Sequence, residues 1–117
     1  HGERNFLKVH EGTHAISKSN KISFKTGMVV SNEPGYYEKN KFGIRIENLI
    51  YVKKNKQKNS FENLTMAPID KDLINVNMLN KNEKNWLNNY HKKVFYNLKN
   101  TMSKEEIIDL KKACSAI

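Results

Sequence analysis

The sequence predicts an α+β fold in which short strands come first and two helices follow. Three observations lead to this prediction. Apolar runs with period-two alternation occur in the first part of the chain, separated by glycine and proline turns. The spacing of apolar residues changes to the helical period in the last part. Two capping boxes, each typical of a helix start, introduce these helical stretches.

The first strands are expected in short segments that glycine and proline interrupt. Residues 6–10 predict a short strand or extended segment, and residues 17–26 are polar and typical of a loop. Residues 27–31 predict a buried strand, which Pro34 and Gly35 should end because proline cannot donate to a ladder.

The strongest strand signal covers residues 42–53. Alternation predicts that Ile44 and Ile46 share one face of this strand, with Arg45 and Glu47 on the other. Residues 53–60 are polar and predict a hairpin-like loop, and residues 61–69 predict a last strand.

Both helices are predicted from their caps and from the apolar residues that follow. Asn80 with Glu83, and Ser103 with Glu106, have the spacing of capping boxes. On these helices Trp86 and Tyr90 are expected in the core, whereas His91, like His14 earlier in the chain, is expected on the surface. The apolar positions at helical spacing are Trp86, Leu87, Tyr90, Val94, Phe95 and Leu98, then Ile107, Ile108, Leu110 and Cys114.

The composition of the chain argues against a specific nucleic-acid partner and against a membrane span. The net charge is +9, but 19 of the 21 basic residues are lysine and 17 residues are asparagine, which favours a solvated surface over a specific nucleic-acid site. No apolar run approaches the ~20 residues that span a membrane. The single cysteine, Cys114, fits a reducing compartment and predicts a cytoplasmic protein.

Histidine and carboxylate residues are the candidates for chemistry. Imidazole and carboxylate groups together suit first-row divalent metals, and carboxylates especially suit manganese. His1, His10, Glu33 and Glu47 supply such groups, and Arg45 shares a strand face with Glu47. Each also has an ordinary explanation, for example a turn residue at Glu33 or a solvated strand face at Glu47.

Several blocks of the sequence resemble the aminopeptidase P family. His1-Gly2 with residues 5–12 is similar to its histidine block, residues 27–38 to its first glutamate block, and residues 42–48 to its second. Residues 64–69 and 86–91 resemble the tail of the three-domain form of that enzyme. The blocks occur in order over almost the whole chain, which makes the resemblance specific.

The resemblance implies the second half of a pita-bread fold, with antiparallel strands followed by two C-terminal helices. Residues 1–69 would carry the metal-site strands and loops, and residues 70–117 a helical tail. The implied activity is that of a metallopeptidase, an Xaa-Pro aminopeptidase in which a hydroxide bridging two divalent metals cleaves the N-terminal Xaa-Pro bond. Manganese is the expected metal, with zinc and cobalt as alternatives.

The resemblance also implies residue roles. His1 and Glu33 would bind one metal, and Glu47 would bridge both. Glu33 would also act as general base. His10 would act as a catalytic group that contacts the substrate carbonyl or stabilises the tetrahedral intermediate. The substrate-binding residues would be His10, Tyr37 and Arg45.

Two aspartate ligands of the family are expected upstream of His1 and are absent from this sequence. The chain is therefore expected to be inactive alone and to require the remainder of its own catalytic domain. The expected substrates are peptides with proline at the second position. The resemblance leaves a homodimer open. Two further alternatives are a non-catalytic pita-bread binding module and a fragment without independent function.

Overall fold

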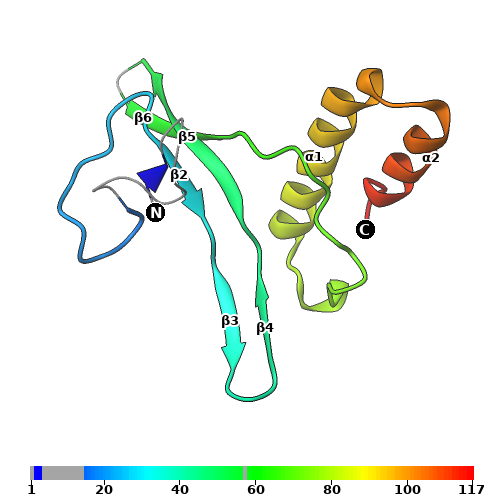
Figure 1. The fold of residues 1–117 in the computed structure, drawn as a ribbon, viewed down its shortest axis with the longest axis horizontal. Helices are drawn as coiled ribbons and strands as arrows, with labels where there is room; N and C mark the ends of the chain where they lie inside the picture. Colours follow the sequence, from blue (N-terminus) through cyan, green and yellow to red (C-terminus); the bar gives the residue numbers. More distant parts are fainter. Residues whose placement is uncertain (1, 4–14, 57) are drawn as a thin grey trace. The chain divides into compact units, whose positions relative to one another are not determined.

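The computed structural model describes residues 2–3, 15–56 and 58–117 (Figure 1). The chain divides into two compact units, His1–Thr65 and Met66–Ile117. The first unit holds the strands and the second holds both α-helices, which confirms the predicted succession of antiparallel strands and two helices. The segment predicted at residues 6–10, and His14, lie outside the described residues.

The first unit contains a four-stranded antiparallel sheet and a two-stranded hairpin. The sheet has the strand order β1-β2-β5-β6, and the hairpin pairs β3 with β4. The strands are β1 Gly2–Glu3, β2 Val29–Asn32, β3 Gly35–Glu38, β4 Phe42–Arg45, β5 Asn48–Asn55 and β6 Lys58–Asn63.

The buried face of the four-stranded sheet is built from β-branched residues. Val30 pairs directly with Ile50, and Val52 lies on the same face two residues further along β5. Val52 pairs in turn with Phe61, whose ring meets Phe24 edge-on at 5.3 Å between centroids. These contacts hold β2 against β5 and so set the relative position of Asn32 and Asn48, where the two strands meet the hairpin.

The prediction of one continuous strand over residues 42–53 is wrong. β4 ends at Arg45 and β5 begins at Asn48. The amide of Ile46 donates to the Pro34 carbonyl at 3.1 Å, but proline has no N–H to donate in return. The ladder is therefore incomplete at this pair, and regular pairing stops on both strands.

Two other strand limits also differ from prediction. The loop predicted at residues 53–60 is a tight hairpin, because β5 and β6 pair up to Asn55 and Lys58, and Lys56, directly after β5, has φ of 47°. The strand predicted over residues 61–69 ends at Asn63. Beyond it the Thr65 hydroxyl accepts a hydrogen bond from the Leu49 amide at 2.8 Å, in place of a ladder contact.

Both predicted capping boxes are present in the second unit. The Asn80 side chain accepts from the Glu83 amide at 3.0 Å, and the Glu83 carboxylate accepts from the Asn80 amide at 2.8 Å. Ser103 and Glu106 form the same reciprocal pair. The helical elements are η1 Val76–Met78, α1 Lys81–Leu98, η2 Lys99–Thr101 and α2 Lys104–Ala113.

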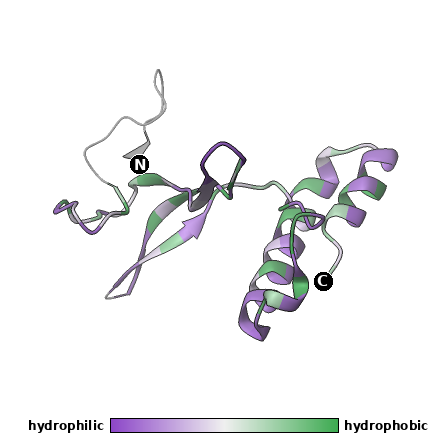
Figure 2. Cartoon of the chain, turned by 90° about the horizontal axis from the view of Figure 1, so that it is seen from below, coloured by the Kyte–Doolittle hydropathy of each residue, from purple (hydrophilic) through white to green (hydrophobic). Residues whose placement is uncertain are grey.

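The core of the second unit lies along one side of α1 and α2. In Figure 2 hydrophobic and hydrophilic stretches alternate along both helices, as amphipathic packing requires. Among the described residues, no helix is both long enough and apolar enough to cross a membrane. The buried core residues are Leu87, Tyr90, Val94 and Leu110, with Met66, Ile69, Ile74, Phe95, Leu98, Met102, Cys114 and Ile117 packed against them.

Three predictions about burial in the second unit are wrong. Trp86, expected in the core, is 57% exposed and stacks on the Tyr90 ring at 5.5 Å between centroids. Ile108, assigned to the apolar stripe of α2, is 68% exposed. His91, expected on the surface, is fully buried, because it stands one turn after Leu87 and one turn before Val94 on the packed side of α1.

Replacing Asn80 with alanine is expected to destabilise the second unit by about 1 kcal/mol, because the first turn of α1 loses its side-chain acceptor. Trp86, the chain's single tryptophan, lies in this unit and reports its unfolding in urea. Asn80→Asp keeps an acceptor and should retain the parental midpoint. An Asn80→Ala midpoint equal to that of the parent would show that the box contributes nothing to stability.

Candidate metal site

Glu33 and Glu47 face each other where the two-stranded hairpin joins the larger sheet. Asn32 pairs with Asn48 on one side of the junction, and Gly35 pairs with Arg45 on the other. The register is the same on both sides, so Glu33 lies opposite Glu47. Two like charges directly opposite each other on paired strands are destabilising unless a cation lies between them.

Arg45 supplies that cation. Its guanidinium lies 3.1 Å from the Glu47 carboxylate and 3.8 Å from Oε2 of Glu33. A hydrogen bond with Tyr37 and the negative charge of Glu47 raise the pKa of Arg45 above its ordinary value, so the guanidinium stays charged. The structure therefore brings together four of the six residues predicted from the sequence, namely Glu33, Tyr37, Arg45 and Glu47.

Two glycines allow Tyr37 to reach Arg45. Tyr37 pairs with Gly43, and Gly35 pairs with Arg45, so the tyrosine ring lies across the hairpin backbone. A Cβ at Gly43 would lie 2.6 Å from the ring, and one at Gly35 would lie 2.8 Å from the hydroxyl. Side chains at these two positions would displace the ring, which explains why both residues are glycine.

Glu33 lies in a more sheltered position than Arg45. The Glu33 side chain is 19% exposed, whereas the Arg45 side chain is 49% exposed. Oε1 of Glu33 accepts a hydrogen bond from the Ser31 hydroxyl at 2.8 Å. Ser31 is not among the residues predicted from the sequence, although its position two residues before Glu33 puts both side chains on the same face of an extended chain.

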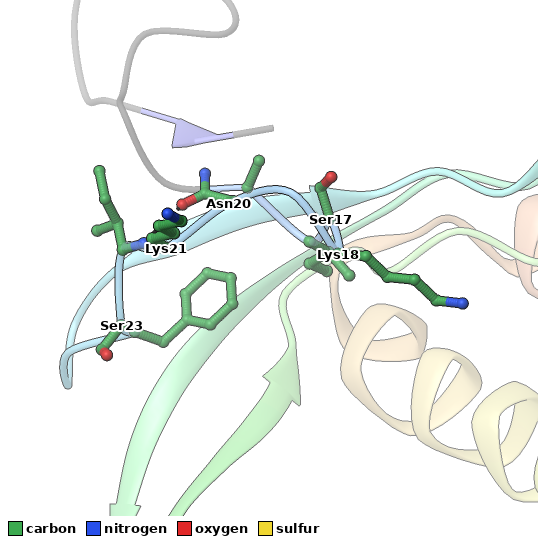
Figure 3. Close-up of a pocket in the computed structure, with 9 residues that line it drawn as sticks. Ser17, Lys18, Asn20, Lys21 and Ser23 are labelled. Carbon is green, nitrogen blue, oxygen red and sulfur yellow. Dashed lines mark hydrogen bonds between the residues drawn. The ribbon is translucent and has the colours of Figure 1, made fainter.

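Glu33 also lines a hollow of about 370 Å³ together with Ser31, Pro34 and residues 15–17. A larger hollow of about 590 Å³ is lined by residues 15–24 alone (Figure 3). In Figure 3 the Lys18 side chain extends away from Asn20 and Lys21, so the charged groups of that loop do not converge. Of these two hollows, the smaller one adjoins Glu33.

The remaining predicted residues, His1 and His10, lie outside the described residues. Within the described part of the chain, no group of three or more His, Cys, Asp or Glu side chains gathers in one place. The described part of the candidate site is thus a pair of opposed carboxylates with one guanidinium near both. Carboxylate oxygens are ligands that suit manganese and similar hard cations, so the donor set fits divalent metal binding.

Two family models match the chain and together cover nearly all of it. The model described as metallopeptidase family M24 matches residues 1–54, and the model described as the C-terminal region of peptidase M24 matches residues 58–117. These matches confirm the resemblance that the sequence blocks indicate.

Curated relatives match with high identity but are much longer. The chain is 49% identical over 102 residues to the probable Xaa-Pro aminopeptidase P of Laccaria bicolor, covering 78% of the chain and 16% of the relative. It is 43% identical over 103 residues to Xaa-Pro aminopeptidase 1 of Dictyostelium discoideum, covering 80% of the chain and 16% of the relative. The chain thus spans about one sixth of the length of these relatives.

A solved structure also matches. X-prolyl aminopeptidase from Caenorhabditis elegans, described as a cytosolic enzyme with a di-nuclear active site, superposes with a TM-score of 0.83 at 32% identity. The match covers 100% of this chain and 21% of that one. It confirms the fold predicted from the resemblance, the second half of a pita-bread domain.

Proposed function

This chain belongs to metallopeptidase family M24, and we propose that it supplies one half of the active site of an Xaa-Pro aminopeptidase. Completed by the preceding part of the catalytic domain, it hydrolyses the bond between the first residue of a peptide and a following proline. The names of the Laccaria and Dictyostelium relatives support this substrate class.

The opposed pair Glu33 and Glu47 is the observation that carries the proposal. Glu33 and Glu47 are held opposite each other, and both carboxylates lie near a single guanidinium. The single positive charge of Arg45 offsets only part of the two negative charges, so the pair can still attract a further cation. Two divalent cations a few ångströms apart, by contrast, need anions between them.

Each residue of the pair has a distinct role in the proposal. Glu47 would bridge the two metals and Glu33 would bind one of them, and Arg45 would orient the Glu47 carboxylate, which lies 3.1 Å from its guanidinium. His1 is proposed as a ligand of the same metal as Glu33. The backbone of its sequence neighbour Gly2 pairs with Val30, in the strand that leads to Glu33, which supports this assignment.

Manganese is proposed as the metal, with zinc or cobalt as alternatives. Bound at this site, it would supply activation of water for attack on the peptide carbonyl. Glu33 takes the proton of the attacking water and passes it to the proline nitrogen as that nitrogen leaves. His10 contacts the substrate carbonyl oxygen. Tyr37 and Arg45, which share a hydrogen bond, would line the substrate side of the site.

A cytoplasmic location is also part of the proposal. The chain carries a single cysteine, and the similar enzyme of Caenorhabditis elegans is described as cytosolic. Both features support a cytoplasmic enzyme.

A completed enzyme is the appropriate material to test the function. It consists of residues 1–117 preceded by the part of the Laccaria bicolor relative that lies upstream of its segment equivalent to this chain. With manganese it is expected to cleave a peptide with proline at the second position and to leave the same peptide with alanine there intact. Failure to cleave under any divalent metal would favour a non-catalytic binding module.

The 117-residue chain alone is expected to be inactive on the same peptides and to bind at most one divalent metal weakly. Its described residues contribute only two carboxylates to the site, and two metals need more ligands than that. The peptidase assay with added manganese measures this directly. Robust Xaa-Pro cleavage by the isolated chain would show that the site is complete without an upstream half.

A further inference from the structure

Ser31 is a buried polar residue next to the candidate metal site. It lies in β2 and is 2% exposed, and its hydroxyl donates to Oε1 of Glu33 at 2.8 Å. Its neighbour Val30 is also fully buried, so both faces of β2 are covered at this point. Because side chains alternate along a strand, Ser31 points to the face opposite Val30, which is the face of Glu33.

The two oxygens of Glu33 therefore have different partners. Oε1 accepts from Ser31, and Oε2 lies 3.8 Å from the guanidinium that also contacts Glu47. The hydrogen bond from this buried hydroxyl restricts rotation of the Glu33 carboxylate. With Oε1 accepting from Ser31, Oε2 is the oxygen on the side of Arg45, whose guanidinium also contacts Glu47.

We propose that Ser31 is a positioning residue that presents Oε2 of Glu33 to a divalent cation. The proposal rests on the proposed function, in which Glu33 is a metal ligand. Groups that hydrogen-bond a ligating carboxylate fix its orientation before the metal arrives, so less freedom is lost on binding. Without the hydroxyl, Glu33 can rotate away from Glu47, and metal affinity falls.

A matched pair of substitutions isolates the hydroxyl. Ser31→Thr and Ser31→Val introduce side chains of nearly the same shape, both favourable in strands, and differ only in the hydroxyl. Ser60→Ala in β6 serves as a control, since its hydroxyl faces the Lys53 carbonyl and not Glu33. Ser31→Ala removes the hydroxyl without adding volume.

The readout is the dissociation constant of Mn²⁺ for the completed enzyme, measured by the electron paramagnetic resonance of free Mn²⁺. Ser31→Val and Ser31→Ala are expected to weaken binding about tenfold, the typical cost of losing a group that orients a ligand. Ser31→Thr and Ser60→Ala should stay within about twofold of the parent. A folding defect would not follow this pattern, because threonine and valine perturb packing alike.

Activity gives a second, independent readout. If Ser31 acts through metal binding, the manganese concentration for half-maximal activity rises in Ser31→Val while activity at saturating manganese returns close to the parental value. Equal manganese affinity in the Thr and Val variants would overturn the proposal. A parent enzyme that binds no manganese would instead overturn the proposed function, so the two failures are distinguishable.

Discussion

Replacing Glu47 with glutamine in the completed enzyme is expected to lower turnover of Xaa-Pro peptides at least about a hundredfold. Even groups that only orient metal ligands cost up to about a hundredfold when removed, so a bridging ligand should cost no less. Glutamine keeps the size of Glu47 but removes the charge opposite Glu33. The loss should therefore appear as metal depletion together with lost turnover.

Two controls separate this effect from general damage. Glu38→Gln changes a glutamate at the tip of the same hairpin, where it pairs with Lys41, and should leave activity and metal content unchanged. His10→Ala should lower turnover with metal content intact, because His10 is proposed to contact substrate and not metal. If Glu47→Gln keeps two metals and near-parental activity, Glu47 is only part of a solvated strand face.

Acidification is expected to destabilise the second unit through His91. The ring is fully buried, and its Nε2 accepts a hydrogen bond from the Ile69 amide at 3.1 Å. At the preceding position of α1 the Tyr90 hydroxyl donates to the Ala67 carbonyl at 2.7 Å. Tyr90 and His91 therefore both bind the segment 67–69 to α1. A proton on Nε2 would remove the acceptor for Ile69 and place a charge in the core.

The sign of the pH effect follows from the pKa of His91. Burial, and then the positive charge of Lys71, lowers this pKa below its ordinary value of 6.5. The folded unit thus binds fewer protons than the unfolded chain, and stability is lost as the pH falls below about 6.5. The slope can reach about 1.4 kcal/mol per pH unit for one group.

Urea unfolding followed by Trp86 fluorescence measures this effect between about pH 7.5 and pH 5. His91 is the only histidine of the second unit, so His91→Gln removes imidazole titration from that unit. The variant should be less stable at neutral pH and should lose less stability on acidification than the parent. Equal pH dependence in both proteins would show that His91 is not the group responsible.

The helices of this chain follow from local sequence, and the strands follow less completely. Capping boxes act within one turn, so Asn80 and Ser103 mark the starts of α1 and α2 without any tertiary information. The break between β4 and β5 depends on a residue of another segment. Pro34 cannot return the hydrogen bond of Ile46, and nothing in residues 42–53 themselves reveals it.

Burial on α1 departs from prediction where residue type conflicts with helical position. The polarity of His91 predicts a surface residue, although its spacing from Leu87 and Val94 places it on the packed side. The apolar ring of Trp86 predicts a core residue, although it lies at the edge of that side and covers Tyr90 instead. Helical position is the better guide to burial in both cases.

The candidate site is predictable in its residues but not in its arrangement. The resemblance to aminopeptidase P singles out Glu33, Arg45 and Glu47. That the two glutamates lie opposite each other follows from strand register, which sequence spacing alone does not define. Ser31 could not be predicted as a site residue, because a serine in a strand does not by itself indicate a functional role. Its role becomes visible only from the hydrogen bond to Glu33.

The central claim is that Glu33 and Glu47 of this chain bind two metals, and anomalous diffraction at the manganese edge tests it most directly. Crystals of the completed enzyme grown with manganese should show two anomalous peaks about 3.5–4 Å apart. We expect the Glu47 carboxylate to contact both peaks and the Glu33 carboxylate to contact one. A single peak, or manganese bound away from both glutamates, would contradict this claim.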